Sequence, residues 1–156
     1  MSTAILNDHS PRISASGDEA EIQALIASLH KAHYDKNVAG IIAPYAPHAA
    51  IFNLAPPLAH VGINPQEKQK WIDSWQTPIE LESRDFQLTV SGDFAFCHGF
   101  LRLKGTKKGP EGQVQFWMRE TMCFEREPEG WRIIHEHASV PFYMDGSLRP
   151  AFDLQP

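Results

Sequence analysis

Apolar residues recur at helical spacing in the first quarter of the chain. The stripe consists of Ile22, Leu25, Ile26, Leu29 and His33. Ser16 and Glu19, just before it, have the spacing of a capping box and predict a helix from about residue 17 to residue 36. Asn37 is expected to cap a second, short helix over residues 38–43, which ends at Pro44.

The pattern changes after this helical region. Residues 49–54 predict a short strand, and the pair Asn64–Pro65 predicts the start of a third helix that ends before Pro78. Beyond Pro78 the apolar period becomes two, which predicts four strands over residues 80–90, 94–104, 114–126 and 131–140. The turns between them are short, so neighbouring strands are expected to be antiparallel. Helices followed by a meander indicate an α+β fold.

The length of 156 residues fits one domain. The pattern places it at residues 18–142, between a mobile N-terminal tail (1–17) and a C-terminal tail (143–156). A net charge of −5 argues against nucleic acid and anionic membranes as partners. The chain has no apolar run of transmembrane length, no signal-peptide pattern and only two cysteines, so a cytoplasmic setting is expected.

Alternation along the four strands divides their side chains between two faces. Counting through the turns predicts one face with polar groups among large apolar ones: Cys97, Leu101, Trp117, Arg119, Cys123, His135 and His137. The other face is then apolar: Phe94, Phe96, Phe100, Phe116, Met118, Met122 and Phe124. A shift of one residue in register would exchange the faces.

The helices can cover only one face of so short a chain. A homodimer through the other face is the favoured way to cover it. The alternative is that the C-terminal tail, with Phe142, Tyr143 and Phe152, folds back over it. The covered face, with polar groups converging in an apolar setting, predicts a pocket for a small-molecule ligand.

Four segments carry a resemblance to a known family: Tyr45–Ala49, Ala95–Gly99, Phe116–Thr121 and Trp131–Phe142. Over about residues 18–142 the chain resembles the nuclear transport factor 2-like (cystatin-like) superfamily, in its SnoaL-like, ketosteroid-isomerase-homologue branch. The resemblance implies a cone-shaped α+β fold with N-terminal helices on a curved, mainly antiparallel sheet, a pocket on the concave face and dimers through the other. Members include isomerases, cyclases, dehydratases and non-catalytic binding modules, so the fold alone does not fix the activity.

Two strand histidines and an arginine are the first catalytic candidates. His137 or His135 would move a proton, because imidazole titrates near neutral pH, or else each is a histidine tied to neighbouring side chains inside the core. Arg119 would stabilise an oxyanion, or else form an internal ion pair with Asp85 or Glu82. His135 and His137 have the spacing of metal ligands, but no convincing third ligand follows, so no metal is expected.

Asn53 falls where the resemblance implies a carboxylate base. An amide cannot take a proton at neutral pH, so Asn53 is expected to orient the substrate or a water, or else to satisfy its own backbone at a strand end. The expected pocket lining is His33, Phe52, Trp71, Trp75, Cys97, Leu101 and Trp117.

No glycine-rich phosphate loop or Gly-x-Ser-x-Gly elbow occurs, so no cofactor is expected. The sequence thus favours a cofactor-independent isomerase, cyclase or dehydratase acting on an apolar cyclic or polyketide-like molecule. The alternative is a non-catalytic ligand-binding or dimeric assembly module of the same fold.

Overall fold

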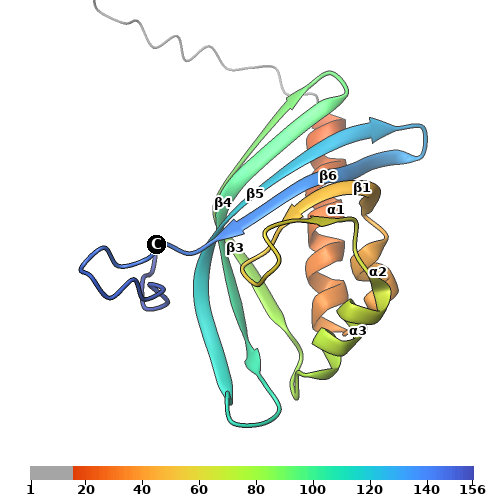
Figure 1. Ribbon diagram of the computed structural model, residues 1–156. Helices are drawn as coiled ribbons and strands as arrows, with labels where there is room; N and C mark the ends of the chain where they lie inside the picture. Colours follow the sequence, from red (N-terminus) through yellow and green to blue (C-terminus); the bar gives the residue numbers. More distant parts are fainter. Residues whose placement is uncertain (1–15) are drawn as a thin grey trace, which may run out of the picture.

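The computed structural model describes residues 16–156, and three helices in it cover one side of a curved sheet (Figure 1). The helices are α1 (Ser16–Tyr34), α2 (Val38–Ile42) and α3 (Pro65–Asp73). The strands are β1 (Tyr45–Phe52), β2 (His60–Val61), β3 (Glu80–Ser91), β4 (Phe94–Thr106), β5 (Gln113–Glu127) and β6 (Gly130–Ser139). They form one sheet in the order β2-β1-β6-β5-β4-β3. The predicted α+β fold is confirmed, whereas the predicted N-terminal tail lies, up to residue 15, outside the described residues.

The predicted capping residues mark the starts of α2 and α3. The Asn37 side chain accepts a hydrogen bond from the backbone N–H of Gly40 and caps α2. Asn64 accepts one from the N–H of Glu67 and caps α3, whose first residue is Pro65. These caps satisfy N–H groups that the first turn of a helix cannot pair internally.

The first strands depart from the prediction. β1 begins at Tyr45 rather than residue 49, and β2 was not predicted. β1 pairs with β6 in parallel and with β2 in antiparallel orientation. A parallel partner from the far end of the chain leaves no local signal, and a strand of two residues has no period to detect.

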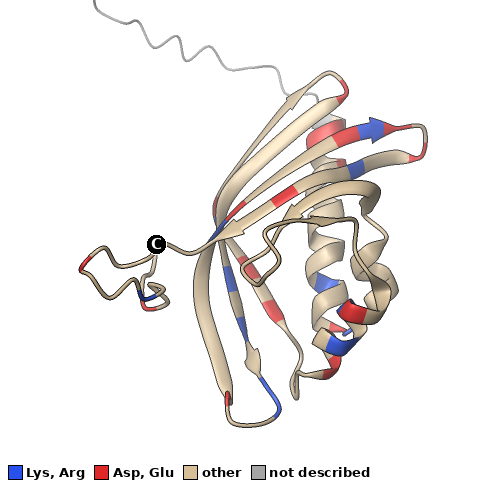
Figure 2. Cartoon of the chain, in the orientation of Figure 1, with Lys and Arg blue, Asp and Glu red and all other residues tan. Residues whose placement is uncertain are grey.

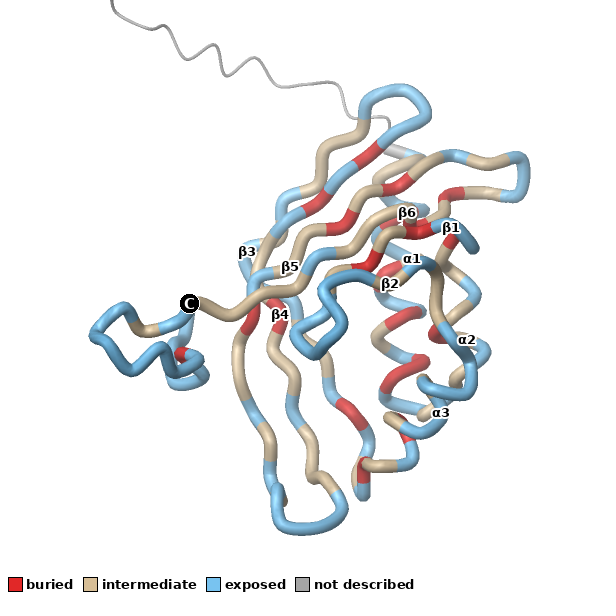
Figure 3. Tube along the Cα trace, viewed as in Figure 1, coloured by how far each residue is buried: buried red, intermediate tan, exposed pale blue. Residues whose placement is uncertain are grey.

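The core lies between α1 and the sheet. Four residues of the predicted helical stripe are buried: Ile22, Ile26, Leu29 and His33. They face buried residues of the strands, among them Cys97, Met122, Phe124 and Ile133. Figure 3 shows buried stretches on α1 and on the strands of the sheet. The stripe therefore sets how α1 sits on the concave face.

The predicted assignment of the two sheet faces is wrong for β4 relative to β5. Leu101 pairs with Met118, and Gly99 pairs with Glu120. Directly paired residues share a face, so Leu101 lies with Met118 and not with Trp117 or Arg119. The turn between β4 and β5 shifts the register by one residue from the predicted count, and such a shift exchanges the faces.

A bulge in β6 changes the faces again. Cys123 pairs with His135, but the next residue, Phe124, pairs with Ile133. Ile134 is thus the extra residue, and it reverses the alternation. Ile133 therefore faces the core, while His135 faces away from it.

The sheet face turned away from the helices keeps exposed aromatic side chains. Phe94 is 56% exposed and Phe96 46%. The C-terminal segment does not bury them, because its Phe152 packs on Phe116 of β5, with ring centroids 4.6 Å apart. The segment forms a loop beyond the end of β6 (Figure 1).

Charged residues are spread over helices and strands rather than gathered on one element (Figure 2). Within residues 16–156, no helix has the length and apolar character needed to cross a membrane.

Candidate functional site

A cavity of about 500 Å³ lies between α1, α3 and the concave face of the sheet. Its apolar lining includes Leu29, Ile51, Trp71, Leu101, Phe116 and Met118. Its polar lining includes His33, Tyr45, Asn53, Lys68, Glu120 and Glu136. A mostly apolar hollow of this size with a few polar groups is the usual form of a small-molecule site.

The structure brings five of the predicted site residues together around this cavity: His33, Asn53, Trp71, Trp75 and Leu101. Asn53 follows directly after β1, and Ile51 of that strand faces the same hollow. Trp71 and Trp75 come from α3 and its C-terminal end, with ring centroids 5.7 Å apart.

The other catalytic candidates lie on the opposite sheet face. Arg119 pairs with Ser139, and Thr121 pairs with His137, on the face away from the helices. Arg119 Nε donates to Ser139 Oγ at 3.0 Å and not to Asp85 or Glu82. The register shift and the Ile134 bulge explain this placement, so these groups cannot reach a molecule in the cavity.

His135 and His137 form an aromatic group with Phe52 on that outer face. The Phe52 ring lies 4.9 Å from the His135 ring and 5.4 Å from the His137 ring, both edge-to-face. His135 Nδ1 is 2.7 Å from the Ala50 carbonyl oxygen. The prediction that Phe52 lines the pocket with these histidines is therefore wrong.

Two more predicted lining residues lie elsewhere. Trp117 is on the outer face, with the Arg84 guanidinium 4.5 Å from its ring centre. Cys97 is buried in the core beside Met122 rather than on the cavity wall. Burial raises the pKa of the Cys97 thiol to about 12, which keeps it protonated and unreactive.

Two glutamates on neighbouring strands define the polar part of the cavity. Glu120 of β5 and Glu136 of β6 both line it. Burial, and then the charge of Glu136, raises the pKa of Glu120 to about 8. Burial also raises the pKa of Glu136, but a hydrogen bond from the Tyr45 hydroxyl and the charge of Lys68 oppose that rise.

These contacts determine which of the two glutamates loses its proton first. Glu136 has the partners that stabilise a carboxylate, so it loses its proton first. Its charge then holds the proton on Glu120, because two adjacent carboxylates repel each other. The cavity therefore holds a carboxylic acid, Glu120, whose pKa is about 8, beside Glu136, the member of the pair that ionises first.

His33 supplies a fixed hydrogen-bond acceptor. Its Nδ1 lies 2.9 Å from the Leu29 carbonyl oxygen and donates to it. Burial lowers the pKa of His33 to about 4, so the ring is neutral. With the hydrogen on Nδ1, Nε2 keeps a free lone pair. The His33 ring also meets the Trp71 ring edge-on, at 6.1 Å.

Four polar residues of the cavity were not predicted from the sequence: Tyr45, Lys68, Glu120 and Glu136. A usable signal was present in β5, where Glu120 is the one charged residue in the alternating series of Phe116, Met118, Met122 and Phe124. A carboxyl group on an otherwise apolar face requires a partner or a function. No comparable signal marks Tyr45, because its contact with Glu136 depends on the parallel β1–β6 pairing.

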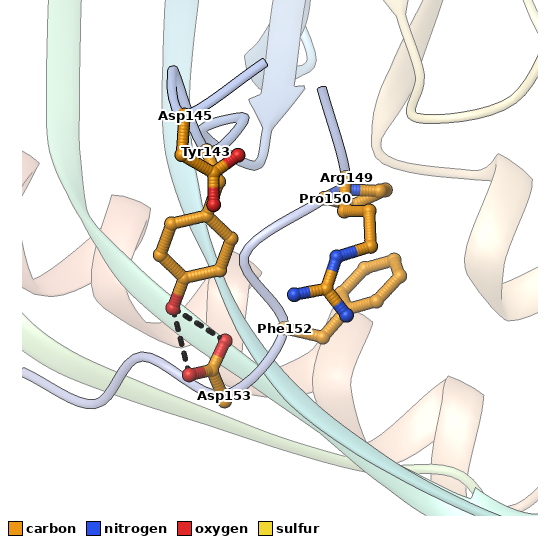
Figure 4. A pocket seen from close by; sticks show the side chains of 6 residues that line it. All are labelled: Tyr143, Asp145, Arg149, Pro150, Phe152 and Asp153. Carbon is orange, nitrogen blue, oxygen red and sulfur yellow. Dashed lines mark hydrogen bonds between the residues drawn. The ribbon is translucent and has the colours of Figure 1, made fainter. Parts of the chain in front are cut away.

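A second hollow, of about 400 Å³, lies within the C-terminal segment. Figure 4 shows the Tyr143 hydroxyl pointing at the Asp153 carboxylate, whose two oxygens are both 2.7 Å away. This hydrogen bond lowers the pKa of Asp153. The hollow is lined by residues 143–153 alone and has no buried polar group, so it is a weaker candidate than the inner cavity.

Within residues 16–156, no three His, Cys, Asp or Glu side chains come close enough together to hold a metal ion.

The profile of the SnoaL-like domain family matches residues 22–143, so the chain belongs to this family. Solved structures support the assignment to the nuclear transport factor 2-like superfamily. One is a protein of unknown function from Pseudomonas putida, at 29% identity and a TM-score of 0.79, with 92% of this chain and 99% of that one covered.

More distant structures share the fold. A proposed dehydratase from Streptomyces avermitilis has 14% identity and a TM-score of 0.69, with 81% and 97% of the two chains covered. A proposed ketosteroid isomerase from Shewanella frigidimarina has 18% identity and a TM-score of 0.61, with 79% and 98% covered. A search of curated proteins gives no match.

Proposed function

We propose that this protein is a cofactor-independent enzyme that moves a proton on a small, largely apolar carbonyl compound. The observation that carries the proposal is the Glu120–Glu136 pair, with Tyr45 bound to Glu136, in the wall of an apolar cavity. Structural neighbours described as a proposed dehydratase and a proposed ketosteroid isomerase are consistent with such chemistry.

The first step is removal of a proton from the carbon next to the carbonyl group. The Glu136 carboxylate takes this proton, and the electron pair moves onto the carbonyl oxygen. Neutral Glu120 donates a hydrogen bond to that oxygen and stabilises the developing negative charge. The acid must be neutral to donate, and its raised pKa of about 8 keeps it so at pH 7.

The second step distinguishes the possible reactions. Return of the proton to another carbon is an isomerisation, loss of a β-hydroxyl group is a dehydration, and attack of the enolate on a second carbonyl is a cyclisation. All three begin with the same proton removal, so the geometry supports this class of reaction rather than one member of it. Asn53 and His33 Nε2 are placed to orient polar groups of the substrate.

The test is hydrogen–deuterium exchange at the α-carbon of 1-tetralone and 3-methylcyclohex-2-enone in D₂O, followed by proton NMR. The protein should accelerate exchange, and Glu120→Gln and Glu136→Gln should each slow it by about 100-fold or more, as expected for loss of a general acid or base. Glu111→Gln, an exposed change of the same chemistry, is the matched control.

A contrary result separates the alternatives. Exchange that depends on His137 but not on either glutamate would overturn the proposal and restore the outer-face histidines as proton carriers. Tight binding of both ketones with no exchange above the buffer rate would instead support the non-catalytic binding module.

We also propose a homodimer through the outer sheet face, in a protein expected to work in the cytoplasm. Phe94 and Phe96 support this interface because they stay exposed after the chain has folded.

A further inference from the structure

Lys68 lines the cavity, and the proposed proton transfer assigns it no bond-making step. It lies on α3, and its ammonium nitrogen is 4.8 Å from the centre of the Trp71 ring. Within residues 16–156, no carboxylate oxygen lies within 4.0 Å of Lys68 Nζ. Lys107, the other lysine on the cavity wall, donates to Ser74 Oγ at 3.0 Å. The Lys68 amine is therefore free to meet a ligand.

The surroundings of Lys68 lower the pKa of its ammonium group, which increases the fraction of neutral, nucleophilic amine. Burial lowers the pKa of Lys68, and the charge of Glu136 opposes this shift only in part. His33, which also lines the cavity, has a pKa of about 4 and is neutral, so it adds no charge beside Lys68. A lysine in an apolar cavity is the usual way in which proteins activate an amine toward carbonyl groups.

We propose that Lys68 forms an imine with an aldehyde or ketone bound in the cavity. This inference rests on the proposed function, because it assigns the same cavity to carbonyl compounds. The Lys68 nitrogen attacks the carbonyl carbon, and a C–N bond forms while the oxygen gains a proton from Glu120. The nitrogen then passes one of its two hydrogens to the same oxygen, the C–O bond breaks, and the oxygen leaves as water. The nitrogen keeps its other hydrogen, so the product is a protonated imine beside the Glu120 carboxylate. No oxidant or reductant takes part.

The carboxyl pair suits this intermediate. A protonated imine carries a positive charge, and Glu136 presents a carboxylate on the wall that Lys68 faces. The iminium group withdraws electrons and makes the neighbouring C–H more acidic, so Glu136 can remove that proton more readily. Lys68 would thereby become a covalent catalytic residue in the same proton transfer.

The test uses 2-naphthaldehyde, which fits an aromatic-lined cavity and has no α-hydrogen, so imine formation is measured apart from enolisation. The full chain is treated at pH 7 with the aldehyde and sodium cyanoborohydride, which reduces an imine to a stable amine. Peptide mapping should place one naphthylmethyl group on Lys68, at least about tenfold faster than on any other lysine, because burial lowers the pKa of Lys68.

Two variants test whether the fast labelling depends on the Lys68 amine. Lys68→Arg keeps the positive charge but cannot form the imine, and it should abolish the fast labelling. Lys70→Arg, on an exposed position of the same helix, should leave it unchanged. Labelling spread evenly over the lysines, or fast labelling that survives in Lys68→Arg, would overturn the proposal. Thermal melting checks that both variants fold, and the wild-type map alone decides the matter if one does not.

The two proposals can fail separately. If ketone exchange requires the glutamates while Lys68 is not labelled, the imine is refuted and the proton-transfer function stands. If Lys68 is labelled selectively but both Glu→Gln variants exchange normally, the imine stands and the acid–base assignment is refuted.

Discussion

The Tyr45 hydroxyl of β1 donates a hydrogen bond to Glu136 Oε2 of β6, across 91 positions of sequence. The parallel β1–β6 pairing makes this contact possible, because it sets Ile51 opposite Glu136 and turns both toward the cavity. The hydrogen bond favours the charged form of Glu136 and so selects it, rather than Glu120, as the base.

Tyr45→Phe should therefore move the pH dependence of α-proton exchange. Loss of the hydrogen bond raises the pKa of Glu136, so the rate should rise with pH later than in the wild type. A hydrogen bond to a charged group contributes about 1.5–3 kcal/mol, which predicts that the rising part of the profile moves up by about one to two pH units. The measurement is a pH–rate profile with 1-tetralone. Tyr34→Phe, at an exposed position, is the control, and an unshifted profile for Tyr45→Phe would refute the role.

Glu120 should make the folded protein less stable as the pH rises. The pKa of Glu120 is raised from 4.5 to about 8 in the folded state. Its contribution to the free energy of unfolding is therefore fully present below about pH 4.5 and is lost as the pH rises through 8. In Glu120→Gln this loss should disappear, and the melting temperature should fall less between pH 5 and 9. Thermal melting monitored by circular dichroism measures the difference. Parallel curves for the wild type and the variant would contradict it, and Glu111→Gln controls for the charge.

The contribution of His33 to the stability of the fold depends on pH in the opposite direction. Its pKa is lowered from 6.5 to about 4, so its contribution to stability is full above pH 6.5 and is lost as the pH falls toward 4. Long-range proton–nitrogen NMR spectra should show hydrogen on Nδ1 and no protonation of Nε2 above pH 5. A His33 titration near its ordinary pKa would show that the ring is solvated and does not face a dry cavity.

The proposed dimer is tested on the outer face. Phe96→Glu places a charge in the middle of the exposed aromatic patch and should convert dimer to monomer in light scattering coupled to size-exclusion chromatography, because burying an unpaired charge is costly. Leu58→Glu, in a loop where the side chain is 97% exposed, should leave the dimer intact. A monomeric wild type at micromolar concentration would refute the interface.

A last prediction concerns the core that holds α1 on the sheet. Phe124 has no exposed surface and packs beneath the helical stripe. Phe124→Ala should cost about 3–5 kcal/mol in the free energy of unfolding, because a large cavity replaces the ring. Urea unfolding followed by tryptophan fluorescence measures the loss. Phe94→Ala, on the exposed outer face, should cost far less, and equal losses would place Phe124 outside the core.

The helices, the four long strands, the α+β class and the resemblance to the family could all be predicted from the amino-acid sequence alone. Asn37 and Asn64 mark their helices through contacts three residues away, and the stripe from Ile22 to His33 repeats with the helical period. Such signals depend only on residues that are close in sequence, so they can be recognised without knowledge of the tertiary structure. The helical spacing of the same stripe also correctly predicted that His33 faces the interior.

Which sheet face forms the cavity wall depends on the pairing of the strands in the tertiary structure. The side-chain period of a strand is two, so one residue of register in the β4–β5 turn and the extra Ile134 in β6 reversed the predicted faces. His137 and Arg119 consequently lie outside, and Glu120 and Glu136 lie inside. Alternation identifies which residues share a face along one strand, but only pairing with neighbouring strands determines which face meets the helices.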